Sequence, residues 1–371
     1  MKNLLILSNM YPSKIGPTFG IFIKNQADQL KQNGMNVDIV AIDNPNMDKF
    51  TVIKKYLTWF LQFLSNFIFK GRKYDIVHVH YIFPTGILGL FYKKIYKKPM
   101  VVTAHGGDID KMAEKNKLFK KCTEYILKQA DFIICVGEEL NQTVQKEYHA
   151  TPDKITTLNM GVDTNIFFPM DSLGLRAKYG IPNDTKTILF VGNIIKAKGV
   201  LELIKAYKSL KHYIPEARLE IIGSKKEPDF FKTLERYIKE ENIQDIFFHE
   251  PKSQKEIAVW MNMSDVFVLP SHIEGLGLVA LEAMACKVPV AGAEVGGLAY
   301  LLSNQAGVLF PPQNAESVEH AIVNILKNKE MNSKRIATAY NKALENNSKN
   351  VIKTLIGIYN SVQEIPERRR S

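Results

Sequence analysis

The alternation of apolar runs with amphipathic segments constrains the fold of this 371-residue chain more than any other feature. Short apolar runs such as 4–8 and 187–191 indicate buried strands, and the segments between such runs have the 3.6-residue period of helices. This order is typical of parallel sheets covered by helices on both faces. The alternation occurs on both sides of residues 161–170, which contain turn formers and no clear period. The sequence therefore predicts two α/β units, each with its own sheet.

We place the domain boundaries at residues 1–165, 166–350 and 351–371, the last segment being an amphipathic helix with a basic tail. Within these domains the apolar runs predict strands at 4–8, 37–42, 76–80, 100–104, 132–136, 155–158, 187–191, 219–222, 246–249, 266–269 and 288–291. The periodic segments predict helices at 20–32, 54–69, 86–96, 118–129, 140–148, 201–210, 228–241, 254–261, 278–286, 315–326 and 351–362.

Composition indicates a globular protein in a reducing compartment. Hydrophobic residues make up 46% of the chain, which is enough to fill two cores. The N-terminus begins like a signal peptide, but its apolar run is too short for one, so we interpret it as the first strand. The three cysteines, Cys122, Cys135 and Cys286, have no CxxC spacing, which disfavours a disulfide framework and a zinc site.

The net charge of +11 is concentrated in one window. Residues 51–121 contain 14 Lys or Arg and 4 Asp or Glu, a net charge of +10, which leaves +1 for the rest of the chain. Inside this window the apolar stretch 56–69 has lysines or arginines on both sides. A helix of this length covers about 21 Å, less than the roughly 30 Å of a bilayer core. We therefore predict peripheral membrane contact through residues 54–73.

The basic window has two other interpretations. A core helix of the first domain with a solvated basic rim would have the same sequence pattern. Nucleic acid is the other natural partner of a basic patch, but the window lacks the arginine-rich and glycine-aromatic patterns of common modules, so we predict no nucleic-acid binding.

The segment 271–285 carries the strongest functional signal. Between the expected strand 266–269 and the expected helix 278–286 lies a turn with Glu274, Gly275 and Gly277. Glycines allow close backbone approach, and the first amides of a helix favour an anion such as diphosphate. Glu282, about one turn into the helix, can accept hydrogen bonds from ribose hydroxyls. The alternative is a helix cap with a solvated glutamate on each side.

Other candidate residues also follow expected strands. His105 comes directly after the strand 100–104, beside two glycines, where a ligand is expected, and Asp108 lies close behind it. His78 and His80 alternate with valines and are expected to line the sheet. Glycines follow strands elsewhere as well, at Gly16 and Gly20 before the first helix and at Gly192 before Lys198. The last of these turns does not match GxGxxG, which disfavours a nicotinamide or flavin cofactor.

The segment 274–285 resembles the glutamate, seven residues, glutamate signature of retaining glycosyltransferases of the GT-B fold, family 4. The resemblance covers residues 1 to about 362 and implies two Rossmann-like α/β/α domains facing each other across a cleft. It implies that residues 351–362 pack back on the first domain. Gly192 and Lys198 resemble the turn that holds the donor diphosphate, but Asn193 replaces the family's arginine, and Lys196 is the candidate that would supply the missing charge.

The resemblance also implies the site residues. His105 and Glu274 would be catalytic, gripping the donor sugar, and Gly16 and Asp108 would contact the acceptor. No metal or separate cofactor is expected, because lysine and helix amides would offset the diphosphate charge. The nucleotide sugar itself would be bound by Gly20, Gly192, Lys198, Gly277, Leu278, Val279 and Glu282.

The expected function is hexosyl transfer, with retention, from a nucleotide diphosphate sugar to a lipid-linked saccharide. The opening 11–24 is similar to bacterial enzymes of teichuronic acid or other surface polysaccharide assembly, which implies a cytoplasmic enzyme on the inner membrane face. Two alternatives stay open at this point. One is a nucleotide-sugar epimerase of the same fold, and the other is a sugar-nucleotide-binding subunit without turnover.

Overall fold

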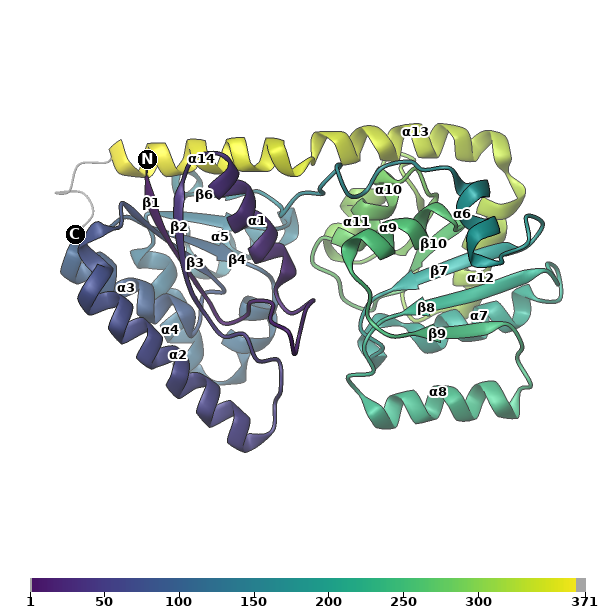
Figure 1. Ribbon diagram of the computed structural model, residues 1–371, viewed down its shortest axis with the longest axis horizontal. Coiled ribbons are helices and arrows are strands. Elements are labelled where there is room, and N and C mark those ends of the chain that lie inside the picture. Colours follow the sequence, from purple (N-terminus) through teal and green to yellow (C-terminus); the bar gives the residue numbers. More distant parts are fainter. Residues whose placement is uncertain (1, 365–371) are drawn as a thin grey trace. The chain divides into compact units, whose positions relative to one another are not determined.

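A computed structural model of the chain describes residues 2–364 and contains two units (Figure 1). Unit 1 runs to Met160 and resumes at Ser348, and unit 2 comprises Gly161–Asn347. The chain therefore leaves unit 1 just before the turn-rich segment 161–170 and returns just before the last helix. The basic tail expected at the C-terminus lies outside the described residues.

Unit 1 is built around a six-stranded parallel sheet in the order β2-β1-β3-β4-β5-β6. Its strands are β1 (Asn3–Ser8), β2 (Asn36–Ala41), β3 (Ile76–His80), β4 (Met100–Ala104), β5 (Phe132–Cys135) and β6 (Ile155–Thr157). Its helices are α1 (Ile21–Gln32), α2 (Lys49–Lys70), α3 (Thr85–Tyr96), α4 (Lys117–Gln129), α5 (Glu138–Tyr148) and α14 (Ser348–Glu364), with short helical turns at Gly71–Lys73, Asp108–Met112, Ala113–Lys115 and Pro152–Lys154.

The last helix belongs to the core of unit 1. Along α14, Ile352, Leu355 and Tyr359 lie on one face at helical spacing and are buried. They pack in one cluster with Leu4 of β1 and Ile23 of α1, so the two ends of the chain close the same core. Burying this apolar stripe is what holds a helix of mostly polar sequence against the sheet.

Unit 2 has a second six-stranded parallel sheet, in the order β12-β11-β10-β7-β8-β9. Its strands are β7 (Lys186–Val191), β8 (Ala217–Ile222), β9 (Ile246–His249), β10 (Val266–Leu269), β11 (Val290–Ala293) and β12 (Val308–Phe310). Its helices are α6 (Ser172–Tyr179), α7 (Val200–Leu210), α8 (Pro228–Glu240), α9 (Gln254–Asn262), α10 (Leu278–Ala285), α11 (Gly296–Leu302), α12 (Ala315–Lys327) and α13 (Lys329–Glu345), with a 3-10 turn at Lys196–Lys198 (η5).

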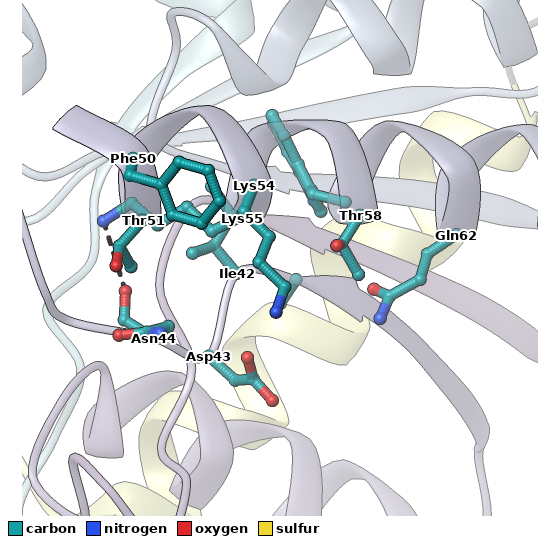
Figure 2. A pocket seen from close by; sticks show the side chains of 11 residues that line it. Ile42, Asp43, Asn44, Phe50, Thr51, Lys54, Lys55, Thr58 and Gln62 are labelled. Carbon is teal, nitrogen blue, oxygen red and sulfur yellow. Dashed lines mark hydrogen bonds between the residues drawn. The ribbon is translucent and has the colours of Figure 1, made fainter.

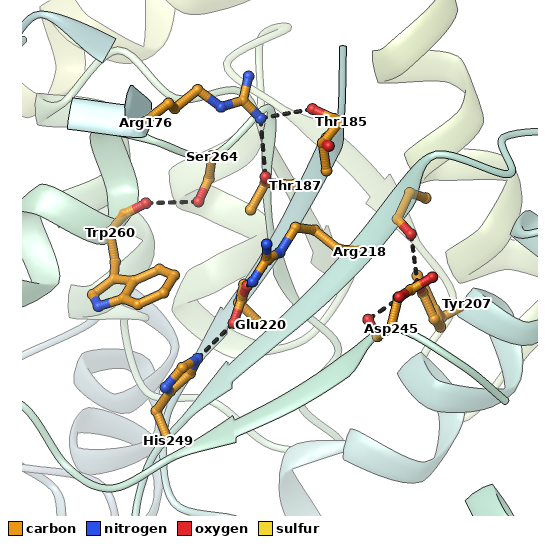
Figure 3. Close-up of polar contacts among 11 residues, drawn as sticks. Arg176, Thr185, Thr187, Tyr207, Arg218, Glu220, Asp245, His249, Trp260 and Ser264 are labelled. Atoms are coloured by element: carbon orange, nitrogen blue, oxygen red, sulfur yellow. Dashed lines mark hydrogen bonds and ion pairs between the residues drawn. The ribbon is translucent and has the colours of Figure 1, made fainter. Parts of the chain in front are cut away.

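Ion pairs of buried side chains brace the sheet of unit 2. Arg176 Nη2 donates to Thr185 O at 2.6 Å (Figure 3). It also pairs with Asp265 at 3.1 Å, which ties α6 to the strands. On β8, the fully buried Glu220 pairs with Arg218 and with His249 Nε2 at 2.5 Å. Each buried charge thus has an opposite charge within contact distance, as burial requires.

The predicted fold is confirmed: two α/β units with parallel sheets, the architecture of GT-B. In such sheets the loops that follow the strands gather at one edge, so each unit has one edge where ligand-binding residues collect.

Candidate functional site

Lys198 and Glu274 form an ion pair at the carboxyl edge of the unit 2 sheet. Because β7 and β10 are neighbours, the loops that follow them meet, and Lys198 Nζ lies 2.6 Å from Glu274 Oε2. Ser271 Oγ lies 3.2 Å from the same oxygen, and His272 N donates to Ala197 O at 2.9 Å. Both charged side chains are mostly buried. The structure thus brings together two residues that the sequence placed 76 positions apart.

The two loops approach each other so closely that only glycine fits at their contact. Gly199 has φ +67°, and a Cβ there would lie 2.0 Å from the carbonyl oxygen of Pro270. Gly277 has φ +78° and is the N-cap of α10, with no side chain capping the helix. The first amides of α10 therefore point out of the helix from a backbone that carries no Cβ at its entry, which is the geometry of an anion site.

Glu282 lies about one turn into α10, as predicted. Its side chain is only partly exposed, and desolvation raises the pKa of its carboxyl to about 8, against a smaller opposing effect of a hydrogen bond with Gln254. A carboxyl in this environment gains from any partner that donates hydrogen bonds to its ionised form. Vicinal hydroxyls are such a partner.

The turn after β7 differs from the one expected of the family. Gly192 follows the strand directly, and its amide donates to Ile222 O at 3.0 Å. Asn193, which stands where the family has arginine, accepts a 2.8 Å hydrogen bond from Ser224 Oγ at its Oδ1. Lys196, the candidate for the missing charge, uses its backbone amide to bind Glu227 Oε2 at 2.9 Å. No ion pair of its ammonium is found among the described residues.

In unit 1, three histidines come together where β3 and β4 end. His80 is the last residue of β3 and His105 follows β4, and His80 Nδ1 lies 3.1 Å from His105 Nε2. Two residues earlier on β3, His78 forms hydrogen bonds through both ring nitrogens. Its Nδ1 lies 2.7 Å from Tyr359 Oη and its Nε2 lies 2.7 Å from Thr103 Oγ1. The sequence analysis predicts that His80 lines the sheet. Its place at the end of a strand was a signal that it could lie beside His105.

Burial keeps these imidazoles uncharged at neutral pH. Desolvation lowers the pKa of His78 and His105 to well below the usual range, with a further contribution from neighbouring histidines, and it lowers the pKa of His80 to about 3. The His105 ring also stacks on Tyr81, with the centroids 4.5 Å apart. His105 can therefore act as a neutral hydrogen-bonding group, and not as a cation.

Asp108, which the sequence predicts to contact an acceptor, accepts hydrogen bonds from the backbone of unit 1. Its side chain is buried, with Oδ1 accepting from His105 N and Oδ2 accepting from Ile82 N, both at 3.0 Å. The carboxylate ties the loop after β4 to the loop after β3. The carboxylate thus positions the His105 backbone, and its contact with an acceptor hydroxyl stays a prediction.

The loop after β1 supplies two glycines with different surroundings. Gly20 is the N-cap of α1 at φ +70°, where a Cβ would lie 2.9 Å from the Met10 carbonyl. Gly16 lies against Pro45, in the segment after β2, and its carbonyl accepts from Ser13 N and Phe19 N. Only Gly20 lies at a helix start, so only Gly20 has the expected anion-site geometry.

The basic window forms a largely exposed helix, α2. Only Trp59 and Phe63 of its side chains are buried, while Ile53 is 70% and Phe69 83% exposed. We call its exposed large apolar side chains the α2 apolar face: Phe50, Ile53, Tyr56, Leu57, Phe60, Leu61, Leu64, Ile68 and Phe69. A monomer rarely leaves so many apolar side chains of one helix in water, and such a patch marks an interaction surface.

A cavity of about 270 Å³ lies beside this face, between α2 and the segment after β2 (Figure 2). Lys54, Lys55 and Thr58 line it from the helix, with Asp43 and Asn44 opposite. The Lys55 ammonium donates to Asn44 O at 3.2 Å and Asn46 O at 2.7 Å, and desolvation lowers its pKa. Within residues 2–364, no helix has both the length and the apolar character needed to cross a membrane.

Two family models match the chain, one over each unit. Residues 20–166 match "Glycosyltransferase Family 4", and residues 172–342 match "Glycosyl transferases group 1". Together they leave only the two ends and a short joint unmatched.

Curated relatives are similar over much of the chain. A D-inositol 3-phosphate glycosyltransferase of Corynebacterium aurimucosum is 29% identical over 68% of this chain, and the match covers 63% of its length. An N-acetyl-alpha-D-glucosaminyl L-malate synthase of Bacillus anthracis is 29% identical over 69% of this chain and 66% of its own. An uncharacterised glycosyltransferase of Methanocaldococcus jannaschii is 26% identical over 88% and 91%.

Solved structures share the fold. A sucrose-phosphate synthase of Thermosynechococcus elongatus has a TM-score of 0.80 at 20% identity, over 98% of this chain and 99% of its own. The Anabaena protein HepE, in complex with UDP-glucose, has a TM-score of 0.78 at 16% identity, over 97% and 100%. At these identities the similarity establishes the architecture of the chain and nothing finer.

Proposed function

Because this chain belongs to the glycosyl transferases group 1, with a family 4 N-terminal domain, we propose that it transfers a sugar from a nucleotide diphosphate sugar to a saccharide acceptor. The observation that carries the proposal is the ion pair Lys198–Glu274 at the entry of α10, with Glu282 one turn further on. A diphosphate requires positive charge and hydrogen-bond donors, which the lysine and the outward-pointing amides supply. A ribose requires hydrogen-bond acceptors, which the carboxyl supplies.

The donor would be bound by unit 2. Glu282 accepts hydrogen bonds from the ribose, and Gly192 and Gly277 let the backbone approach the nucleotide. Lys198 and the amides at the start of α10, from Gly277 to Val279, hold the diphosphate and offset the charge that develops on it as it leaves. We propose that these groups suffice without a metal ion or organic cofactor.

Glu274 and His105 would contact the sugar. When the diphosphate binds, Lys198 turns from Glu274 to the phosphates, and the released carboxylate faces the sugar. For the chemistry we propose retention by front-face attack, in which an oxygen of the leaving diphosphate takes the acceptor proton, so that no side chain serves as base. A covalent intermediate on Glu274 is the rival route, and trapping of a glycosylated Glu274 by mass spectrometry would favour it.

For the acceptor we propose a lipid-linked saccharide of bacterial surface polysaccharide synthesis, reached at the cytoplasmic face of the membrane. The α2 apolar face and the lysines around it support this proposal. They lie on unit 1, the half expected to bind the acceptor. Uridine donors are the first to test, since HepE was crystallised with UDP-glucose.

The test starts with donor binding. Purified protein is melted with UDP, GDP and ADP sugars, and the cognate donor raises Tm because only the folded state binds it. The radiolabelled cognate sugar is then incubated with extracted lipids. We expect label in the lipid fraction, and label recovered only as an epimerised nucleotide sugar would replace transfer by epimerisation.

Variants separate catalysis from binding. Glu274→Ala should still raise its Tm with the donor but lose transfer, while Lys198→Ala should lose both. Glu235→Gln, at an exposed position in the middle of α8 of the same unit, is the matched control and should change neither. Unchanged transfer by Glu274→Ala in the presence of other cellular proteins would mean that the chain only binds the sugar nucleotide.

A further inference from the structure

His80 has an unusual set of partners for a fully buried side chain. Its Nδ1 faces His105 Nε2 at 3.1 Å, and its Nε2 is buried with no hydrogen-bond partner among the described residues. His78, two residues earlier on the same strand, has partners on both nitrogens. The proton positions on His80 and His105 can be deduced from this asymmetry.

Two neutral arrangements satisfy the bond between the two rings. Either His80 carries its proton on Nδ1 and donates it to His105, or His105 carries its proton on Nε2 and donates it to His80. The second arrangement puts the His80 proton on Nε2, which creates a buried N–H without a partner. Among buried backbone groups, an N–H without a partner is rarer than an acceptor without one, and we apply the same preference to the ring nitrogen. The first arrangement is therefore favoured.

We propose that His80 is a positioning residue that fixes His105 as the tautomer with its proton on Nδ1. His105 Nε2 then accepts from His80, and Nδ1–H is left as a donor, with no partner among the described residues. The ligand for this donor is an oxygen acceptor, and a hydroxyl oxygen of the donor sugar is its chemical class. This assignment rests on the proposed function, which places the sugar beside His105.

The fixed tautomer limits what His105 does. With Nε2 engaged and Nδ1 protonated, the ring offers one hydrogen bond and has no free lone pair to take a proton. His105 is then a neutral donor that orients the sugar, and the acceptor proton must go elsewhere, as in the front-face route. The Asp108 carboxylate adds to this by holding the His105 backbone amide.

Nuclear magnetic resonance measures the tautomer directly. In protein labelled with 15N-histidine, the His105 signals are assigned by their loss in His105→Asn. We expect a protonated Nδ1 and an unprotonated Nε2 on His105 at pH 7, in the absence of any ligand. A protonated Nε2 on His105 would overturn the proposal, whatever the enzyme turns out to do.

Activity gives a second readout. His80→Leu removes the donor, and we expect kcat to fall about tenfold, the effect of one misplaced hydrogen bond, with KM for the donor unchanged. His80→Asn, whose amide can donate from nearly the same place, should recover part of kcat. His78→Leu is the matched control, because His78 is as buried but its hydrogen bonds go to Tyr359 and Thr103, and not to His105.

A purely structural role predicts a different pattern. His78→Leu and His80→Leu would then lower Tm and kcat together, and the His105 tautomer would stay as it is in both. If wild-type protein transfers no sugar at all, the proposed function fails, but the tautomer measured in the wild type and in His80→Leu still decides the role of His80.

Discussion

The Glu282 carboxyl should make the stability of unit 2 depend on pH. Its pKa is raised to about 8 by desolvation, above the usual value near 4.5, so the folded state holds a proton that the unfolded state loses. Stability therefore falls as pH rises from about 5 to 8. In Glu282→Gln we expect the free energy of unfolding to fall by about 1–3 kcal/mol less over this pH range than in wild type. This range is discounted because the side chain is partly exposed. Urea denaturation at both pH values measures it.

Glu294→Gln is the control for this prediction, because Glu294 is exposed in the same unit. Wild type and Glu282→Gln losing equal stability between pH 5 and 8 would contradict it. Nucleotide binding should release a proton over the same range if ribose hydroxyls bind the ionised form, and calorimetry in two buffers of different ionisation enthalpy detects this.

Gly199 is the backbone residue on which the approach of the β7 and β10 loops depends. In Gly199→Ala the new Cβ would meet the Pro270 carbonyl oxygen at 2.0 Å, so the loops must separate. We expect a loss of about 3 kcal/mol or more in the free energy of unfolding, and loss of donor binding. Gly180→Ala is the matched control: its φ is +66°, with nothing within 4 Å of the new Cβ, and it should cost only about 1–2 kcal/mol. Equal costs would show that the contact is unimportant.

At this scale the sequence predicted the positions of the candidate residues better than their contacts. Glu274 and Lys198 lie in loops after strands, and Glu282 lies about one turn into α10, as expected. The ion pair between Lys198 and Glu274 could not be predicted, because it depends on which strands are neighbours in the sheet. The contacts of Asp108 could not be predicted for a similar reason: nothing local to its sequence shows that two backbone amides donate to its carboxylate.

At the scale of elements, the unpredicted segments are those without an apolar period. The α13 helix has only a few buried side chains, among them Ala339 and Ala343, and its remaining face is polar. The β12 strand has three residues, and α11 starts with two glycines that disfavour a helix. Long apolar runs, in contrast, were found at nearly their true bounds, because burial on both faces of a parallel sheet demands them.

The α14 helix should stabilise unit 1 specifically. Leu355 is fully buried against the cluster formed by β1 and α1, so Leu355→Ala should lower the free energy of unfolding by about 2–5 kcal/mol. Lys353→Ala, exposed on the same helix, should cost less than about 0.5 kcal/mol. Amide hydrogen exchange locates the effect: protection should fall in β1 and α1, and a fall confined to unit 2 would contradict the assignment.

At the scale of the whole molecule, the separation of charge between the units predicts how the protein partitions onto membranes. The window 51–121 carries +10 of the +11 net charge and includes α2 and α3 of unit 1. Each lysine near an anionic surface contributes about 1 kcal/mol to the free energy of membrane binding. Apolar side chains that enter the membrane add a contribution that salt does not screen. Binding should therefore weaken with salt without disappearing.

Flotation with anionic liposomes tests this prediction. We expect Leu57→Glu with Phe69→Glu to abolish floating, since both side chains are exposed on the α2 apolar face. Phe67 is unsuitable for this test because its ring packs on Tyr92 and Tyr96 inside unit 1. Leu173→Glu, equally exposed but on unit 2, is the control and should float like wild type. If wild type stays at the bottom at low salt, the apolar face has another partner, and a lipid-linked acceptor loses its main support.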